Sequence, residues 1–288
     1  MKTTLAFLFA GLTIALSGAT QLPVNEFSSW KIPQNWKHTA DQLEYPFTKW
    51  SSASTALELK KEGLHRVTFR YRTPGAAGVP LKIRIGTKVA AAFPATETWS
   101  LATVYFREKS PVPLAFIAEG KNPYALQIKE VKLEALEDAD CRKIHLSADD
   151  GVSPFRTMKG DAHQTVKVTD HIDEGSAFLC RGSGAKDIRS IELPATPGKR
   201  YRLTFWTKGT LGTLRATVDG GWFPNTKYWS FGETIPVSEE WKKFSMEFRY
   251  PTEKEYPYLK RGLLSCRFSI PDGQMELFLK GIELEELP

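Results

Sequence analysis

The stretch RYRLTFWTKG, residues 200–209, contains the side chains best suited to contact a ligand. Side chains alternate between the two faces of a β-strand, so this stretch is expected to have an apolar face and a polar one. The apolar face carries Tyr201, Leu203 and Phe205, and the opposite face carries Arg202, Thr204, Trp206 and Lys208. An indole stacks on the C–H face of a pyranose ring while flanking polar groups bind its hydroxyls. Trp206 therefore predicts a sugar platform, with packing beneath a loop or against another part of the chain as the alternative.

The next strand and the connection after it extend this candidate site. We expect the outward side chains of that strand to lie beside Trp206, namely Arg215, Thr217 and Asp219, with Arg249 or Arg267 nearby. The segment GGWFPNTKYW, residues 220–229, then contributes Trp222, Phe223, Tyr228 and Trp229. Such a cluster either binds a flat apolar surface of a ligand or folds over the sheets as a plug. We expect at least one of the four to bind ligand.

Catalytic signatures are absent from the sequence. It has no His-Glu-x-x-His motif, no G-x-S-x-G motif and no phosphate-binding glycine loop, which predicts a protein that is not an enzyme. No cofactor is expected apart from a structural calcium ion. Hard oxygen ligands for it are available from two acidic pairs, Asp149 with Asp150 and Asp170 with Asp173, and the alternative is that these are ordinary turn residues. The net charge of +6 is a moderate basic excess, and no nucleic-acid partner is predicted.

The first nineteen residues resemble a secretory signal peptide. Lys2 precedes a run of twelve predominantly apolar residues at 5–16, and Ser17-Gly18-Ala19 supplies small residues for cleavage after Ala19. That run is too short to span a bilayer, and no later stretch approaches ~20 apolar residues. The sequence therefore predicts a soluble protein that is secreted or periplasmic, without a transmembrane segment.

Three cysteines follow the predicted signal peptide: Cys141, Cys180 and Cys266. One disulfide can form among three cysteines in an oxidising compartment. Cys180 and Cys266 both lie in strand-like runs, so they are the favoured pair. The alternative is two buried, reduced cysteines on neighbouring strands.

Alternating apolar runs separated by turn dipeptides such as Pro197-Gly198 and Asp272-Gly273 predict an all-β protein. The chain also contains an internal repeat. Residues 66–72 match residues 202–208, Trp99 matches Trp241, and the closing run from Leu126 matches the run from Leu277, with offsets of 136, 142 and 151. The offset grows in two places, so the second copy has insertions within residues 220–233 and 249–262. We expect two domains, residues 20–137 and 138–288, each with its own core.

The first repeat lacks the aromatic features of the second. Its equivalent face carries Arg66, Arg70, Arg72, Lys82 and Arg84. Guanidinium groups are well shaped for sulfate or uronate groups. The alternative is a solvated charged face that prevents edge aggregation.

Four segments of the second repeat occur in a recognisable order: PGKRYRLTFWTKG, LRATVDGG, EEWKKFSMEFRYP and MELFLKGIELEEL. Together they resemble the jelly-roll carbohydrate-binding modules of the galactose-binding-domain-like group, which includes xylan- and glucan-binding modules. The resemblance covers most of the second repeat and is weaker in the first. It implies two tandem β-sandwich (jelly-roll) domains, and it also implies the structural calcium ion considered above.

The residues and the resemblance together predict an exported, non-catalytic protein that binds a polysaccharide or oligosaccharide through its second domain. The expected ligand-binding residues are Arg202, Trp206, Lys208, Arg215, Trp222, Tyr228 and Trp229. Modules of this group are commonly attached to a catalytic domain, whereas this chain holds two modules only. It would therefore act alone or with a separate glycan-degrading enzyme or cell-surface protein. The alternative function is a cell-surface structural or protein-interaction module without a glycan ligand.

Overall fold

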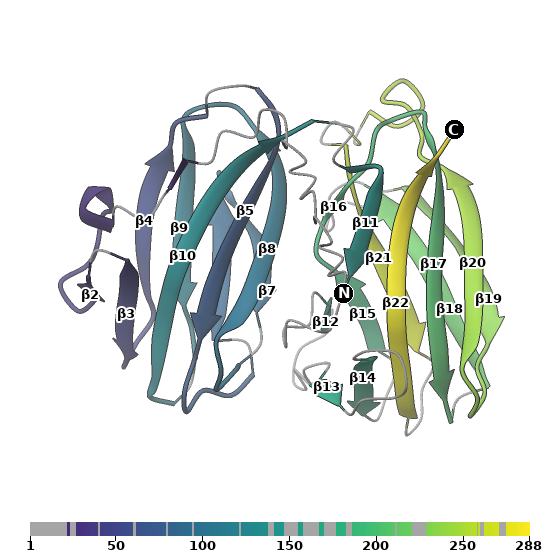
Figure 1. The fold of residues 1–288 in the computed structure, drawn as a ribbon, viewed down its shortest axis with the longest axis horizontal. Coiled ribbons are helices and arrows are strands. Elements are labelled where there is room, and N and C mark those ends of the chain that lie inside the picture. The colour runs from purple at the N-terminus through teal and green to yellow at the C-terminus, as the bar shows by residue number, and fades with distance from the viewer. Residues whose placement is uncertain are drawn as a thin grey trace, which may run out of the picture.

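A computed structural model describes residues 22–23, 27–39, 41–59, 62–78, 80–93, 95–120, 122–137, 141–146, 155–157, 167–169, 177–182, 186–210, 212–220, 229–257, 259, 262–270 and 275–288. Two β-sandwiches lie side by side, one from each half of the chain (Figure 1). All strand pairs between named strands are antiparallel in the part of the chain that is described, and the single helix there is one 3₁₀ turn. The predicted all-β class, with two tandem sandwiches, is confirmed.

The first sandwich pairs one sheet in the order β2–β3–β10–β5–β8, with β1 also beside β10, and a second sheet in the order β4–β9–β6–β7. Its elements are β1 (Leu22–Pro23), η1 (Phe27–Ser29), β2 (Lys37–His38), β3 (Gln42–Phe47), β4 (Ser51–Leu57), β5 (Gly63–Arg72), β6 (Leu81–Ile85), β7 (Lys88–Phe93), β8 (Ser100–Glu108), β9 (Val112–Ala118) and β10 (Tyr124–Leu136).

The second sandwich pairs a sheet in the order β13–β14–β22–β17–β20, with β11 beside β22, and a sheet in the order β12–β15–β21–β18–β19, with β16 beside β21. Its strands are β11 (Lys143–Leu146), β12 (Phe155–Thr157), β13 (Lys167–Thr169), β14 (Ala177–Gly182), β15 (Lys186–Ser190), β16 (Leu193–Pro194), β17 (Arg200–Gly209), β18 (Thr213–Gly220), β19 (Trp229–Pro236), β20 (Lys242–Arg249), β21 (Leu263–Ile270) and β22 (Met275–Leu287).

The two sandwiches repeat one topology, as the sequence offsets predict. The order β3–β10–β5–β8 recurs as β14–β22–β17–β20, and β4–β9–β6–β7 recurs as β15–β21–β18–β19. Individual hydrogen bonds recur as well. The backbone N–H of Thr73 donates to Thr96 O at 2.7 Å, and the N–H of Gly209 donates to Ser238 O at 2.8 Å. These two pairs are separated by the predicted offsets of 136 and 142 residues.

Both predicted insertions fall in connections between strands. Residues 86–87 join β6 to β7, whereas residues 221–228 join their counterparts β18 and β19. Residues 109–111 join β8 to β9, whereas residues 250–262 join β20 to β21. The scaffold is therefore conserved between the repeats, and the added residues lie at the ends of its strands.

Each sandwich has its own apolar core. Inward residues of β17 such as Leu203 and Phe205 are fully buried, while the alternating outward residues are partly exposed, as the period of two predicts. Ile191 packs against both cores, between β15 and β16. The predicted domain boundary falls between β10 and β11. No described residue belongs to a helix long and apolar enough to cross a membrane. The predicted signal peptide lies outside the described residues.

Candidate functional site

Trp206 lies on the outer face of its sheet, as predicted, and is partly exposed. Its strand β17 pairs with β20 and β22, so Trp206 stands opposite Lys243 on one side and Lys280 on the other. A Cβ atom at Gly281 would lie 3.3 Å from Trp206 Cδ1, which places the indole edge over that glycine. The predicted apolar and polar faces of this strand are therefore both present.

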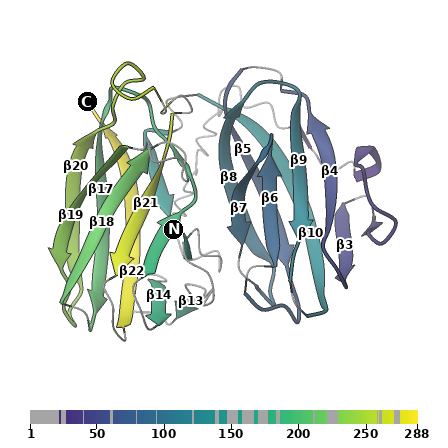
Figure 2. The same ribbon diagram turned by 180° about the vertical axis from the view of Figure 1, so that it is seen from behind.

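The prediction that Arg215, Thr217 and Asp219 lie beside Trp206 is wrong. Their strand β18 pairs with β19 and β21 in the other sheet, and their side chains are on the outer face of that sheet. Alternation along a strand shows which residues point outward, but consecutive strands of a sandwich can belong to opposite sheets. The predicted site is thus divided between two faces on opposite sides of the second sandwich (Figure 2).

Arg202 is already paired within the protein. Its Nη2 lies 2.7 Å from Glu247 Oε1, and its Nη1 lies 3.7 Å from Glu285 Oε2. The hydrogen bond from Arg202 lowers the pKa of Glu247. At this end of the β22–β17–β20 face, the positive charge of Arg202 is therefore balanced by carboxylates of the protein. At the other end, Lys208 is in cation–π contact with the rings of Trp241 and Phe278.

Trp229 is the first residue of β19 and packs against the core of the second sandwich. It is directly opposite Gly220 in the register of β18 and β19, and its ring packs 5.6 Å from Tyr250 and 5.8 Å from Phe248 between centroids. The core lies beneath it, and it stays partly exposed. This packing favours the plug alternative for Trp229. Trp222, Phe223 and Tyr228 lie outside the described residues.

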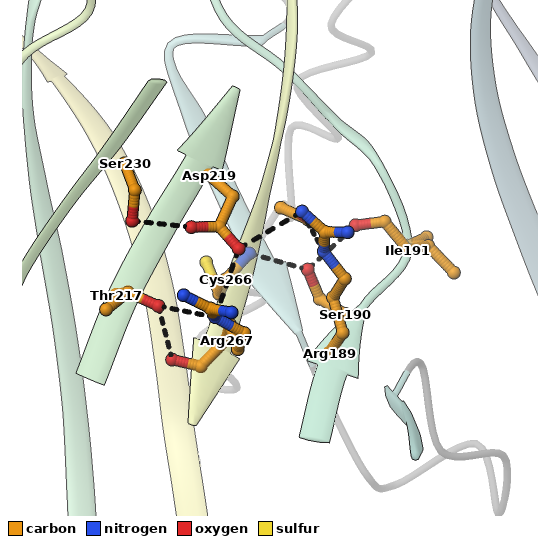
Figure 3. A network of polar contacts seen from close by, with 9 residues as sticks. Arg189, Ser190, Ile191, Thr217, Asp219, Ser230, Cys266 and Arg267 are labelled. Atoms are coloured by element: carbon orange, nitrogen blue, oxygen red, sulfur yellow. Dashed lines mark hydrogen bonds and ion pairs between the residues drawn. The ribbon is translucent and has the colours of Figure 1, made fainter. Parts of the chain in front are cut away.

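A buried ionic cluster occupies the outer face of the β15–β21–β18–β19 sheet (Figure 3). Asp219 Oδ2 lies 3.1 Å from Arg189 Nη2 and 3.1 Å from Arg267 Nε. The other carboxylate oxygen of Asp219 accepts a hydrogen bond from Ser230 Oγ at 2.8 Å. The Asp219 side chain is 2% exposed, so its carboxylate is committed to these partners.

Strand register accounts for this cluster. Thr217 stands opposite Arg267, which stands opposite Arg189, so these three residues lie in one row across β18, β21 and β15. Asp219 stands opposite Ser265 in the next row, and Arg189 Nε donates to Ser265 Oγ at 2.6 Å.

Sequence reasoning missed Arg189 and Ser265, and it placed Asp219 on the wrong face. A signal was present, because outward positions on an exposed sheet usually carry long, solvated side chains. The motif ATVDGG and the segment LLSCRFSI instead alternate buried apolar residues with short polar ones, which is compatible with a packed polar layer. The exposed Arg215 lies on this same face, in the row beyond Thr217.

The prediction of one basic face in the first repeat is wrong, because Arg66, Arg70 and Arg72 lie in β5 whereas Lys82 and Arg84 lie in β6 of the other sheet. Four of these five side chains are paired within the protein. Arg66 contacts Glu134 at 2.6 Å, and Arg70 contacts Glu130 at 3.1 Å. Arg72 donates to Gln127, and Lys82 pairs with Glu119. These pairs favour the structural alternative over a site for sulfate or uronate in this repeat.

Cys266 has a free thiol, so it is not bridged to Cys180 in the structure. Cys266 lies in β21, whereas Cys180 lies in β14 of the opposite sheet, so the two are not on neighbouring strands. The candidate calcium ligands at 149–150 and 170–173 lie outside the described residues. Within the described part of the chain, no group of three or more His, Cys, Asp or Glu side chains is placed to hold a metal ion.

A tryptophan with two cations is present in each repeat. The Arg72 guanidinium and Lys129 Nζ lie 4.8 and 4.5 Å from the Trp99 ring centroid. In the second repeat, the matching distances to Trp241 are 5.3 Å for Lys208 Nζ and 4.6 Å for Lys280 Nζ. The three positions correspond through the offsets of 136, 142 and 151, so the outer faces as well as the cores follow the repeat.

The fold and these two faces define a tandem pair of antiparallel β-sandwiches. No protein-family model matches the chain. No curated protein matches it either.

Solved structures similar to this chain include carbohydrate-binding modules. The tandem CBM22-1–CBM22-2 domain of Paenibacillus barcinonensis Xyn10C has 14% identity and a TM-score of 0.39, covering 93% of this chain and 96% of that one. The family 11 module of the Clostridium thermocellum cellulase Lic26A-Cel5E has 15% identity and a TM-score of 0.36, covering 50% of this chain and 95% of that one. The active domain of tailspike protein 4 of bacteriophage CBA120 has 15% identity and a TM-score of 0.38, covering 49% and 21%. None of these structures identifies a ligand for this chain.

Proposed function

We propose that this protein is an exported, non-catalytic carbohydrate-binding protein whose main site is the outer face of the β15–β21–β18–β19 sheet. The observation that carries the proposal is the cluster of Arg189, Asp219 and Arg267. Ionic contacts and hydrogen bonds hold these side chains in one geometry before any ligand arrives. The accessible members of this array are Arg267, whose side chain is 19% exposed, and the exposed Ser230. Groups that are already held in place suit the fixed hydroxyls of a sugar, because little side-chain entropy is lost on binding.

The surroundings of the cluster support the same proposal. Asp219 and Ser230 are the last pair but one before the connection at 221–228, the segment whose sequence contains Trp222 and Tyr228. The exposed Arg215 lies further along the same face. Aromatic rings beside aligned polar groups are the usual composition of a sugar site. A separate glycan-degrading enzyme or cell-surface protein would supply the activity that this chain lacks.

A binding experiment tests the site. The full-length secreted protein is titrated with neutral oligosaccharides of xylan and of mixed-linked glucan, and then compared with Arg215→Ala, Trp222→Ala and Tyr228→Ala. We expect loss of affinity of roughly tenfold in at least one aromatic variant, which corresponds to about 1.4 kcal/mol. Ser245→Ala, exposed on the opposite face, is the matched control and should bind as the unaltered protein does.

Two results would overturn the proposal. One is the absence of binding to any glycan on an array, which would favour a structural or protein-interaction module. The other is glycan binding that none of the three variants weakens. Export is tested separately by sequencing the N-terminus of the protein recovered outside the cytoplasm, which should begin at Thr20.

A further inference from the structure

Each repeat contains a β-bulge at the equivalent position of its last strand, and the residue at the bulge differs between the repeats. In the second repeat, this bulge lies on the β22–β17–β20 face. The register of β10 on β5 shifts between Lys129 and Lys132, and the register of β22 on β17 shifts between Thr204 and Trp206, just beyond Lys280. The bulge residue has a φ of 54° in both repeats. It is Glu130 in the first repeat and Gly281 in the second, which are 151 residues apart.

In the first repeat, the bulge residue supplies an anion to two donors. The Glu130 carboxylate lies 3.1 Å from Arg70 Nε and 3.4 Å from Lys129 Nζ. Arg70 and Lys129 are directly opposite each other on β5 and β10. One carboxylate therefore neutralises a cation on each of two adjacent strands.

In the second repeat, the lysine remains, an indole replaces the arginine, and the carboxylate is missing. Trp206 takes the place of Arg70, Lys280 takes the place of Lys129, and Gly281 takes the place of Glu130. Among the described residues, neither the indole N–H of Trp206 nor the ammonium of Lys280 has a hydrogen-bond acceptor. Lys280 is 9% exposed and contacts the Trp241 ring. Neither Lys280 Nζ nor Trp206 Nε1 is a fully buried atom, so both donors can reach an external acceptor.

Positive charge is concentrated around these two donors. Lys243 stands directly opposite Trp206, and Lys208 is in the adjoining row next to Trp241. Within the described residues, no carboxylate forms an ion pair with Lys208, Lys243 or Lys280. The far end of the same face differs, since Arg202 there is paired with Glu247 and Glu285.

We infer that this bulge binds the carboxylate of an acidic sugar, a uronate residue of a polysaccharide, as a second site on the second sandwich. The uronate carboxylate accepts hydrogen bonds from Lys280 Nζ and Trp206 Nε1, the role that Glu130 has toward Lys129 and Arg70. The sugar ring stacks on the exposed part of the Trp206 indole. This site faces away from the Arg189–Asp219–Arg267 cluster and does not depend on the proposed neutral-glycan site.

The decisive experiment places a carboxylate of the protein itself at the bulge of the second repeat. The full-length protein is titrated with an oligogalacturonate and, in parallel, with neutral oligosaccharides. Gly281→Glu copies the first repeat, where a glutamate adopts the same backbone conformation, so it should abolish oligogalacturonate binding. Gly281→Gln carries the same Cβ atom and nearly the same shape without the charge, and it should retain most of the affinity. Lys280→Gln should lose roughly tenfold or more, and the affinity of the unaltered protein should fall with added salt.

A reciprocal variant creates the site in the first repeat. Glu130→Gln, made in the Lys280→Gln background, removes the internal carboxylate from Arg70 and Lys129 and should restore measurable oligogalacturonate binding. Thermal melting of every variant shows that it is folded. Arg215→Ala, on the opposite face, should leave oligogalacturonate binding unchanged even if it weakens neutral-glycan binding.

Several outcomes would overturn the inference. They are the absence of oligogalacturonate binding by the unaltered protein, equal binding by Gly281→Glu and Gly281→Gln, and a folded Lys280→Gln variant with unchanged affinity. Equal affinity for poly-glutamate would show an acidic-protein surface instead of a sugar site. Loss of oligogalacturonate binding in Arg215→Ala would move the acidic ligand to the other face.

Discussion

Asp219 Oδ2 accepts a hydrogen bond from Arg189 Nη2 at 3.1 Å, and less than a tenth of either side chain is exposed. Asp219→Asn removes the carboxylate that pairs with both Arg189 and Arg267. We expect a loss of about 3–5 kcal/mol in the free energy of unfolding, because a buried charge is left without its partner. Denaturant unfolding measures it. Glu247→Gln, which breaks an exposed pair with Arg202, is the control and should change stability little. Similar losses in both variants would show that burial of the cluster is unimportant.

Gly220 is required by the packing of the insertion at 250–262. A Cβ atom there would lie 2.7 Å from Tyr250 Cε2 and 2.8 Å from Leu259 Cδ2, both of which are buried. Gly220→Ala should therefore destabilise the protein by about 1–3 kcal/mol through overpacking. Gly212→Ala is the matched control, since its Cβ atom would meet nothing within 4 Å. Thermal or urea unfolding of the pair decides the question, and equal stability would contradict the packing.

Cys266 should be protected from thiol reagents in the folded protein. Burial is the main cause that raises its pKa to about 12, with the Asp219 charge adding to it. A raised thiol pKa contributes stability below the ordinary value of about 9, and this contribution is lost as the pH rises toward 12. In a Cys141→Ser, Cys180→Ser background, the remaining thiol should react only on unfolding. Rapid reaction under native conditions at pH 8 would contradict this burial.

Glu255 should titrate far below an ordinary glutamate. Hydrogen bonds from Arg249 first, and then from the Thr252 backbone and hydroxyl, lower its pKa to about 2. A lowered carboxyl pKa contributes stability above about 4.5, and this contribution is lost as the pH falls through about 2. Carbon-detected NMR titration of the side chain measures the value. Arg249→Gln should raise it toward that of a free glutamate, and an unchanged value would show that Arg249 is not the cause.

The second sandwich should fold without the first. Each sheet is built from strands of one half, and the two cores are separate clusters. Two partly buried side chains bridge them: Ile191 packs against both cores, and Tyr105 of β8 packs against the core of the second sandwich. A fragment of residues 138–288 should therefore unfold cooperatively, with Ile191 and the surface that Tyr105 covers more exposed than in the full-length protein. Circular dichroism during a thermal melt tests this. A molten, aggregating fragment would place the boundary elsewhere.

The repeat was predictable because it leaves identical spacings in the sequence. The backbone N–H groups of Thr73 and Gly209 donate to equivalent carbonyl groups, and the rings of Trp99 and Trp241 contact equivalent cations. The offsets measured on apolar residues therefore extend to the outer faces. Sheet membership was not predictable in the same way. Alternation assigns Trp206 and Asp219 to outward faces, but only the pairing of β17 and β18 with different partners shows that these faces are opposite.

The polar cluster and the bulge depend on contacts that a single strand does not encode. Arg189, Asp219 and Arg267 come from three strands, and each is an ordinary outward polar residue in isolation. The bulge could have been found by aligning Lys129-Glu130 with Lys280-Gly281 at the offset of 151. That comparison shows a change from a carboxylate to a glycine within a run whose apolar positions match.

The shared φ of 54° at Glu130 and Gly281 also bears on the ancestry of the chain. A left-handed conformation is favourable for glycine and uncommon for glutamate. The simplest history has a glycine at this bulge in the single unit that was duplicated, with the first copy later acquiring a glutamate that its own cations hold in place. In this history the first copy gained a carboxylate that neutralises its own cations, whereas the second copy kept the ancestral glycine.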